Sequence, residues 1–247
     1  MADSDRVALV TGAARGLGAA IARALAAAGH PVALVDIDLA NAERAAAEIT
    51  SAGGRAAVFD ADVTDHSAVA ALVDRVDAEL GTVGVVVLNA TGPQPSVEFL
   101  DLRWDDLLDQ LRFFVLSPLL LMQAFVPRMP GGGRVIMIGS DFAWRTAPGI
   151  SAYSAAKAAQ HSLVRSWAAE LGPRNITVNG VAPGWIPVER HATASPVELA
   201  AYVDDVPLGR FGTPADVAGA VVYLAGPDAA FVTGEIIAVN GGHTPKS

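Results

Sequence analysis

The 247-residue sequence contains no cysteine, which excludes disulfide bonds and thiolate metal sites. Its 17 lysines and arginines form no cluster, and the formal net charge is −9. Nucleic-acid binding through phosphate contacts depends on basic clusters, so the sequence argues against it. The five histidines are scattered without a His-x-x-x-His pair, so we expect no metal site.

Long uninterrupted apolar runs are also missing. The longest apolar stretch, Phe113–Val126, is interrupted by Ser117, Pro118 and Gln123 and is shorter than the roughly 20 residues that span a bilayer. The acidic start, Met1–Asp5, runs directly into a predicted strand and does not resemble a signal peptide. We therefore expect a soluble, cytoplasmic protein.

Apolar residues are abundant: they make up 52% of the chain, against 17% charged residues. Short β-rich runs alternate with longer helical segments, and continuous apolar runs such as Val83–Leu88 are typical of strands buried on both faces. The pattern predicts one α/β domain over residues 1–247, with about seven parallel strands and helices on both faces in a doubly wound, Rossmann-like fold. The expected strands are Val7–Val10, Val32–Val35, Ala56–Phe59, Val83–Leu88, Arg134–Ile138, Thr177–Val181 and Ile236–Val239. The expected helices are Leu17–Ala28, Ala40–Ser51, Ser67–Leu80, Trp104–Met129, Tyr153–Leu171, Pro196–Val203 and Ala215–Leu224.

Several residues mark the expected helix boundaries. Thr213 and the proline after it have the pattern of an N-cap and a first helical position. Gly29, Gly53 and Gly81 each stand where a helix should end. Pro118 falls inside the longest helical pattern and should kink or divide it.

A glycine-rich turn follows the first predicted strand and opens the first helix. Gly12, Gly16 and Gly18 would let backbone N–H groups approach a pyrophosphate at the positive end of the helix. Such a pattern alone is a weak signal, but its place between a strand and an Ala-rich helix predicts a dinucleotide site.

Asp36, at the end of the second strand, would accept hydrogen bonds from the adenosine ribose and repel a 2′-phosphate, which predicts NAD in preference to NADP. Arg15 argues weakly for NADP, because a basic side chain in the turn could reach a 2′-phosphate, although it could equally be a solvated surface residue. Asp62 and Val63, after the third strand, would flank the adenine. A simple turn or helix cap is the alternative for Asp62.

Tyr153 and Lys157 are four residues apart and share one helix face. The lysine ammonium would lower the pKa of the tyrosine, so that the phenol can exchange a proton with an alcohol or ketone near neutral pH. Ser140, thirteen residues upstream at the end of a predicted strand, would donate a hydrogen bond to the same substrate oxygen. These three residues, together with the glycine turn, predict hydride transfer to or from a carbonyl carbon.

From Thr11 to Gly242 the chain resembles the short-chain dehydrogenase/reductase family, and within it the 3-oxoacyl-carrier-protein-reductase-like group. The motifs that carry the resemblance are Thr11-Gly12 with Gly16 and Gly18, Asp62-Val63, Asn89-Ala90, Ser140, Tyr153, Lys157, Asn179, Pro183-Gly184, Gly209-Arg210-Phe211-Gly212 and Val239-Asn240-Gly241-Gly242. The resemblance implies hydride transfer at nicotinamide C4 and a homotetramer or homodimer. It adds Leu17, Asn89, Pro183, Gly184 and Ile186 to the residues expected to hold the cofactor.

Three positions depart from the family pattern. The family's Asn-Asn-Ala-Gly segment is here Leu88-Asn89-Ala90-Thr91. The helix asparagine that links the catalytic lysine to solvent is missing, since no asparagine lies between Asn89 and Asn175, and the alignment puts Phe114 there, or else a neighbour (Arg112 or Phe113). Val188 replaces a threonine that holds the carboxamide. The proton relay must therefore run differently, or turnover is slow.

Substrate contacts should come from segments beyond the carboxyl ends of the strands. Gln94, Phe142, Trp144 and Trp185 are the candidates, and they favour a largely apolar or cyclic substrate; each aromatic could instead serve packing or a subunit contact. His191 fits a solvent-facing loop residue better than a catalytic one. The sequence leaves open an NADP-dependent 3-oxoacyl or polyketide-type reductase, and a nicotinamide-binding protein with little turnover. An enoyl reductase fits less well, because that relative places the tyrosine and lysine further apart.

Overall fold

The structure, a computed structural model, describes residues 6–145, 147–187 and 196–243. Seven parallel strands form one sheet in the order β3-β2-β1-β4-β5-β6-β7. The chain winds outward from β1 to β3 and then returns to β4 on the other side of β1. The carboxyl ends of β1 and β4 therefore flank the switch point, where ligands bind in open α/β sheets. The strands are β1 Val7–Thr11, β2 Val32–Asp36, β3 Ala56–Asp60, β4 Val83–Leu88, β5 Arg134–Ile138, β6 Thr177–Pro183 and β7 Ile236–Val239.

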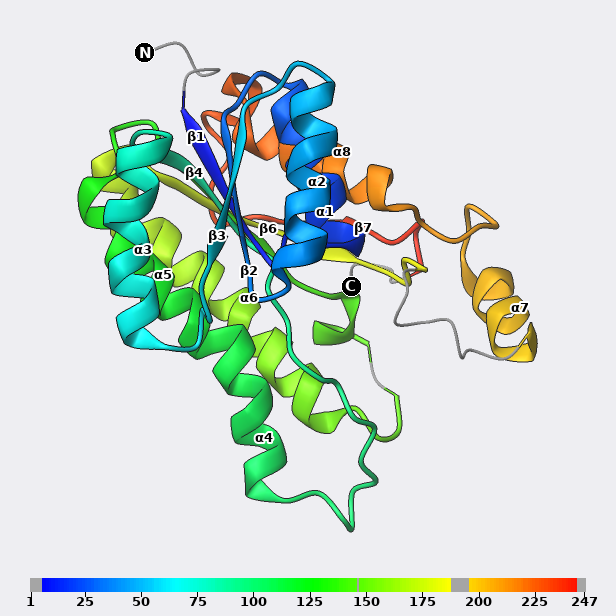
Figure 1. Cartoon of the computed structure of the whole chain (residues 1–247). Coiled ribbons are helices and arrows are strands. Elements are labelled where there is room, and N and C mark those ends of the chain that lie inside the picture. The colour runs from blue at the N-terminus through cyan, green and yellow to red at the C-terminus, as the bar shows by residue number, and fades with distance from the viewer. Residues whose placement is uncertain (1–5, 146, 188–195, 244–247) are drawn as a thin grey trace.

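Helices cover both faces of the sheet (Figure 1). One apolar layer joins the sheet to α1, α2 and α8, and the other joins it to α3, α5 and α6. The helices are α1 Gly16–Ala27, α2 Leu39–Ser51, α3 His66–Glu79, α4 Trp104–Leu111, α5 Ser117–Phe125, α6 Ser151–Leu171, α7 Pro196–Asp205 and α8 Pro214–Ala225. Short helices are η2 Arg112–Leu116, η3 Val126–Arg128, η4 Asp141–Ala143, η5 Gly172–Arg174 and η7 Pro227–Ala229.

The predicted strands are confirmed, with β1, β2 and β3 one residue longer and β6 two residues longer than expected. Thr213 caps α8 as predicted: its hydroxyl accepts from the Asp216 N–H at 3.2 Å, and the Asp216 carboxylate accepts from the Thr213 N–H at 2.7 Å. Gly29, Gly53 and Gly81 lie just after the ends of α1, α2 and α3.

The predicted long helix is divided, as Pro118 indicated. α4 continues into the π-helical turn η2, and α5 begins at Ser117 with Pro118 in its first turn. Proline has no N–H to donate, so it fits the first turn of a new helical segment.

The apolar stretch Phe113–Val126, which we expected to be too short to cross a membrane, lies within a longer helical run. The continuous helical run Trp104–Arg128 is long and apolar enough to cross one, by length and composition only. Its residues Phe114, Leu121, Met122 and Phe125 are buried within the fold. A buried core helix can have the same length and apolar composition as a membrane-spanning helix.

Candidate active site

The glycine turn between β1 and α1 is tightly closed. The N–H of Gly12 donates to Val35 O at 2.9 Å, which ties the turn to β2. Gly12 and Gly16 have φ values of 65° and 53°, a region that favours glycine. A Cβ at Gly18 would lie 2.0 Å from the Gly12 carbonyl oxygen, so a side chain there would force the helix away from the turn.

The N-terminus of α1 carries no side-chain cap. Its N-cap residue, Arg15, makes no side-chain hydrogen bond to the first turn. The first N–H groups of a helix have no intrahelical partners, and the helix dipole adds partial positive charge beside them. Leu17 is half-buried in this first turn. The turn, the helix end and the close packing at Gly18 therefore fit a pyrophosphate.

Asn89 braces the turn from the end of β4. Its amide donates to the carbonyl oxygens of Thr11 at 2.9 Å and Gly12 at 3.1 Å. The Thr11 hydroxyl accepts from the N–H groups of Asn89 and Ala90. These bonds join β1 to β4 at the switch point, so in this structure Asn89 supports the cradle from behind.

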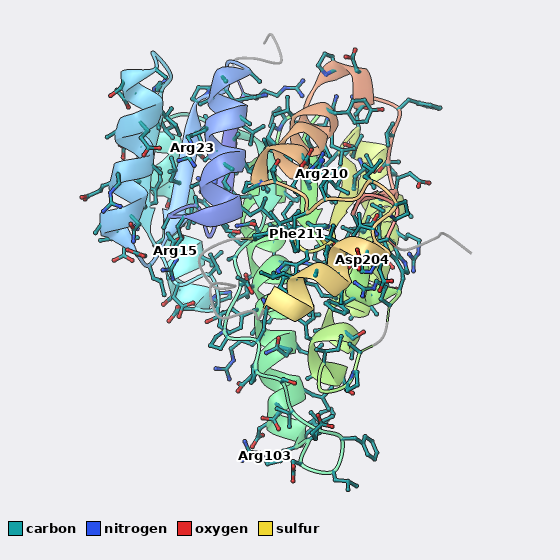
Figure 2. The ribbon with its side chains drawn as sticks, turned by 90° about the vertical axis from the view of Figure 1, so that its right-hand side faces the viewer. Arg15, Arg23, Arg103, Asp204, Arg210 and Phe211 are labelled. Carbon is teal, nitrogen blue, oxygen red and sulfur yellow. The ribbon has the colours of Figure 1, made fainter. Side chains whose placement is uncertain are left out.

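Asp36 is half-buried at the end of β2. One carboxylate oxygen accepts from the Ala14 N–H at 2.9 Å and the other from the Asp38 N–H at 3.0 Å. Hydrogen bonds to Asn41 lower the pKa of Asp38, and the nearby charge of Arg15 acts in the same direction. Arg15 itself is exposed on the surface beside this edge (Figure 2).

Asp62 and Val63 follow β3, as predicted. The Asp62 carboxylate accepts from the N–H and the hydroxyl of Thr64 at 2.8 and 2.7 Å, which is the turn arrangement left open as the alternative. Val63 is buried.

Tyr153 and Lys157 lie in the first two turns of α6, and Ser140 follows the end of β5. The Lys157 ammonium is 5.9 Å from the centroid of the Tyr153 ring and donates to Ile138 O at 2.7 Å and Gln160 Oε1 at 3.1 Å. Ser140 is buried, and its hydroxyl oxygen accepts from the Phe142 N–H at 3.2 Å. The phenol and the buried ammonium thus lie at the start of α6, close to the segment after β5 that carries Ser140.

Two aromatic rings flank Tyr153. Phe114 meets it edge-on with the centroids 5.5 Å apart, and Phe142 meets it at 6.3 Å. The Lys157 ammonium stands 3.9 Å from the centroid of the Phe114 ring. Phe114 is therefore the residue of η2 that reaches the lysine, as the alignment predicted, whereas Phe113 packs beneath Gly92.

The predicted substrate residues do not form one continuous wall. Gln94 is exposed and donates to the Thr91 hydroxyl at 2.7 Å. Trp144 is 44% exposed and lies over the ring of His161 at 4.8 Å. Trp185 packs edge-on against Tyr202 of α7, and the backbone N–H of Trp185 donates to the Tyr202 hydroxyl at 2.7 Å.

The Tyr202 ring anchors α7 on the segments around it. It stacks on Phe211 at 5.2 Å and meets His243 edge-on at 4.6 Å. Figure 2 shows Asp204 on α7 below Phe211 and Arg210. Burial raises the pKa of the Tyr202 hydroxyl, which favours its neutral, hydrogen-bonding form.

Sequence reasoning missed a buried polar group next to Ser140. Asp141 is 2% exposed, pairs with Arg145 at 3.3 Å and lies 3.8 Å from His243 Nδ1. Burial raises the pKa of Asp141 and lowers that of His243, so the histidine contact is mainly with a neutral ring. The i, i+4 spacing of Asp141 and Arg145 was the available signal, but nothing in the sequence placed His243 beside them.

The remaining cofactor candidates lie at the end of β6. Pro183 is buried in the strand, the Gly184 N–H donates to Val239 O at 3.1 Å, and Ile186 is buried against Gly212. Val188 and His191 lie outside the described residues. Among the described residues, no three His, Asp or Glu side chains gather in a way that could hold a metal ion.

A family model described as enoyl-(acyl carrier protein) reductase, one of the short-chain dehydrogenase/reductase models, matches residues 12–244. The chain is a short-chain dehydrogenase/reductase. It is 38% identical to the cyclohexanol dehydrogenase of Rhodococcus sp. strain TK6 (97% of this chain, 96% of the relative). It is 36% identical to the 3-oxoacyl-[acyl-carrier-protein] reductase of Vibrio harveyi (96% of both). The crystal structure of a blue fluorescent protein from a metagenomic library in complex with NADPH superposes with a TM-score of 0.90, 36% identity and coverage of 97% and 98%.

Membership in this family makes the chain an NAD(P)-dependent oxidoreductase that acts on CH–OH groups. The Rossmann-like fold predicted from the sequence is confirmed by the parallel sheet and by these relatives.

Proposed function

We propose that this short-chain dehydrogenase/reductase interconverts a secondary alcohol and a ketone with Tyr153 as general acid/base. The observation that carries this proposal is the buried Lys157 ammonium near the Tyr153 ring, which also donates to Ile138 O two residues before Ser140. A positive charge close to a phenol favours the phenolate, so Tyr153 can take the proton of an alcohol or return it to a carbonyl oxygen. The Ser140 hydroxyl would hold the same oxygen in line.

The cofactor cradle is formed by Gly12, Gly16, Leu17 and Gly18, where uncapped N–H groups would hold the pyrophosphate. The bound nicotinamide dinucleotide supplies or accepts the hydride. We propose that Lys157 also reaches the nicotinamide ribose and that the segment Pro183–Ile186 holds the ring. Asp62 and Val63 would flank the adenine, and Asn89 keeps the cradle closed.

We propose NAD as the preferred cofactor. Asp36 is fixed at the turn by two N–H donors, with Asp38 close by, and two carboxylates would repel a 2′-phosphate. Two observations favour NADP instead. Arg15 is exposed and could approach such a phosphate from the surface. One similar protein binds NADPH. The fixed carboxylate is the feature of this chain that favours NAD.

For the substrate, we propose a largely apolar or cyclic alcohol. Phe142, Trp144 and Trp185 contribute aromatic surface beyond the strand ends, with Gln94 as a polar member. The similarity to a cyclohexanol dehydrogenase supports this class. Enoyl reduction is disfavoured by the four-residue spacing of Tyr153 and Lys157.

Two alternative functions are each supported by one specific observation. The similarity to a 3-oxoacyl-[acyl-carrier-protein] reductase favours NADP-dependent reduction of an acyl or polyketide-type ketone. The phenylalanine at position 114 favours a nicotinamide-binding protein with little turnover, because a phenyl ring cannot relay a proton. We further propose a cytoplasmic homotetramer or homodimer, which sedimentation would test.

The deciding experiment is to titrate the purified protein with NADH and NADPH by nicotinamide fluorescence and then to add a panel of ketones that includes cyclohexanone. Tighter NADH binding and NADH oxidation on a ketone are expected. Preference for NADPH with turnover on a 3-oxoacyl thioester would replace the proposal by the first alternative. Binding without turnover on any ketone would replace it by the second.

A further inference from the structure

We infer that Gln160 and Phe114 together hold the ammonium of Lys157, so that its amide partner comes from its own helix, α6, and not from the helix opposite. Gln160 is then a positioning residue for Tyr153. The inference rests on the proposed function, because it concerns the lysine that assists the proposed acid/base. It assigns a role to a residue that the sequence analysis did not select.

The hydrogen bonds of Lys157 show where the amide comes from. Lys157 is 4% exposed and donates to Gln160 Oε1 at 3.1 Å. Gln160 is 2% exposed and stands three residues further along α6, so both side chains share one helix face. The second acceptor is Ile138 O at the end of β5, two residues before Ser140. A buried ammonium needs such acceptors, since burial of an unpartnered charge is very costly.

Phe114 also contacts the ammonium. Its ring centroid lies 3.9 Å from the Lys157 nitrogen, and the residue is 2% exposed. The face of a phenyl ring attracts a cation, and the attraction is stronger when both groups are buried away from water. A phenyl ring neither accepts nor donates a proton, so Phe114 can hold the charge but cannot itself relay a proton.

The turn η2 explains how Phe114 comes to face the lysine. A π-helical turn contains one residue more than an α-helical turn at the same place, which shifts the direction of the side chains that follow. Phe113 packs beneath Gly92 in the loop after β4, while the next residue faces Lys157 and Tyr153. The consecutive residues Phe113 and Phe114 thus pack against two different segments, the loop after β4 and helix α6.

Other ionisable groups lie on the elements packed around Tyr153. His161, one turn after Lys157, is buried, and burial followed by the charge of Lys157 lowers its pKa to about 4, so it is neutral near pH 7. Asp141 of η4 is paired with Arg145 and lies near His243, and Tyr202 is held by the Trp185 N–H. From η2, the only ionisable side chain is that of Arg112, which is exposed.

The test measures the ionisation of Tyr153 without any substrate. The chain has three tyrosines, so the ultraviolet absorption of tyrosinate can be titrated against pH, and subtraction of the Tyr153→Phe titration isolates Tyr153. Gln160→Leu removes the acceptor and keeps an apolar side chain of similar length. Because the ammonium is then held less firmly beside the phenol, we expect the Tyr153 midpoint to rise by about one pH unit.

Two further variants make the test specific. Phe114→Leu removes the ring face and should also raise the midpoint. Adding Phe114→Asn to Gln160→Leu offers an amide from η2 instead, and it should lower the midpoint again. Gln110→Leu is the matched control: it alters another buried glutamine, which donates to Pro93 O at 2.9 Å and not to the lysine partners named above, and should leave the midpoint unchanged.

An unchanged midpoint in Gln160→Leu, in protein whose NADH binding and thermal unfolding match the parent, overturns the inference. So does an equal shift in Gln110→Leu. Failure of the proposed function looks different: absence of turnover on every ketone would leave the expected midpoint shifts intact. Turnover on a ketone combined with an unshifted midpoint would remove the role of Gln160 alone.

Discussion

At the residue scale, the phenol of Tyr153 is the group on which the proposed chemistry depends. Tyr153→Phe removes only the hydroxyl and keeps the ring that packs against Phe114 and Phe142. We expect kcat to fall by about 10²- to 10⁴-fold, the range that a general acid/base contributes, while the Kd for NADH stays within about twofold. Stopped-flow turnover and fluorescence titration measure the two quantities. Tyr223→Phe, on the exposed side of α8, is the control, and unchanged turnover in Tyr153→Phe would contradict the assignment.

Asp36 gives a second prediction at this scale. Asp36→Asn keeps an oxygen that can accept from the Ala14 or Asp38 N–H but removes the negative charge. The ratio of the Kd values for NADPH and NADH should fall by about tenfold or more, because each 1.4 kcal/mol of relieved repulsion is worth a factor of ten. Asp60→Asn, at the end of the neighbouring strand β3, controls for a general change in charge. A ratio that changes equally in both variants would mean that Asp36 does not discriminate between the cofactors.

At the element scale, the capping box of α8 holds the loop that carries Phe211 and Arg210. Thr213→Ala removes the hydroxyl that accepts from the Asp216 N–H and donates to the Asp216 carboxylate. We expect a loss of about 1 kcal/mol in the free energy of unfolding, typical of a lost N-cap, measured by urea denaturation. Thr213→Ser keeps the hydroxyl and should lose only a few tenths, roughly, on the same scale. Equal losses in both variants would show that packing of the methyl group, and not the cap, stabilises the helix end.

The elements themselves were largely predictable from the sequence. Continuous apolar runs such as Val83–Leu88 gave the buried parallel strands, because burial on both faces leaves no alternation. Pro118 marked the division of the long helix. The sequence did not reveal that the division would be a π-helical turn, since no residue type encodes one, nor how far helical geometry would extend across Trp104–Arg128.

The candidate site was predictable only in part. Motif spacing gave the glycine turn after β1, Ser140 after β5, and Tyr153 and Lys157 on α6. Gln160 and the Asp141 group were missed because their meaning lies in tertiary contacts: Gln160 matters only because Lys157 turns toward it, and Asp141 because His243, about a hundred residues later, packs beside it. The spacing of residues along the sequence does not determine which way a side chain points inside the core.

At the scale of the whole molecule, a buried neutral histidine makes stability depend on pH. Burial lowers the pKa of His161 to about 4 from 6.5. Between these two pH values the imidazole is therefore protonated in the unfolded chain and neutral in the folded chain. The contribution of His161 to the free energy of unfolding is therefore fully present above the unfolded pKa of 6.5 and is lost as pH falls toward 4. Between pH 7 and pH 5, His161 should account for a loss of about 2 kcal/mol.

Urea denaturation of the parent and of His161→Leu at several pH values checks this. The difference between the two proteins isolates His161, since contributions such as that of Asp141, whose pKa is raised by burial and which therefore acts in the opposite direction, are common to both. His66→Gln, at the exposed start of α3, is the control. A difference that does not vary between pH 7 and pH 5 would mean that the protonated ring is accommodated in the fold.

The π-helical turn η2 has a consequence for how this enzyme can change. It separates the register of α4 from that of α5, so the two segments need not rotate together when either is altered. α5 is bound to the core through Leu121, Met122 and Phe125, whereas α4 presents exposed Trp104 and Leu108. Substitutions or insertions in α4 and the preceding loop can therefore accumulate without displacing α5. For engineering, the exposed side of α4 is therefore the part of this helical run where substitutions should disturb the core least.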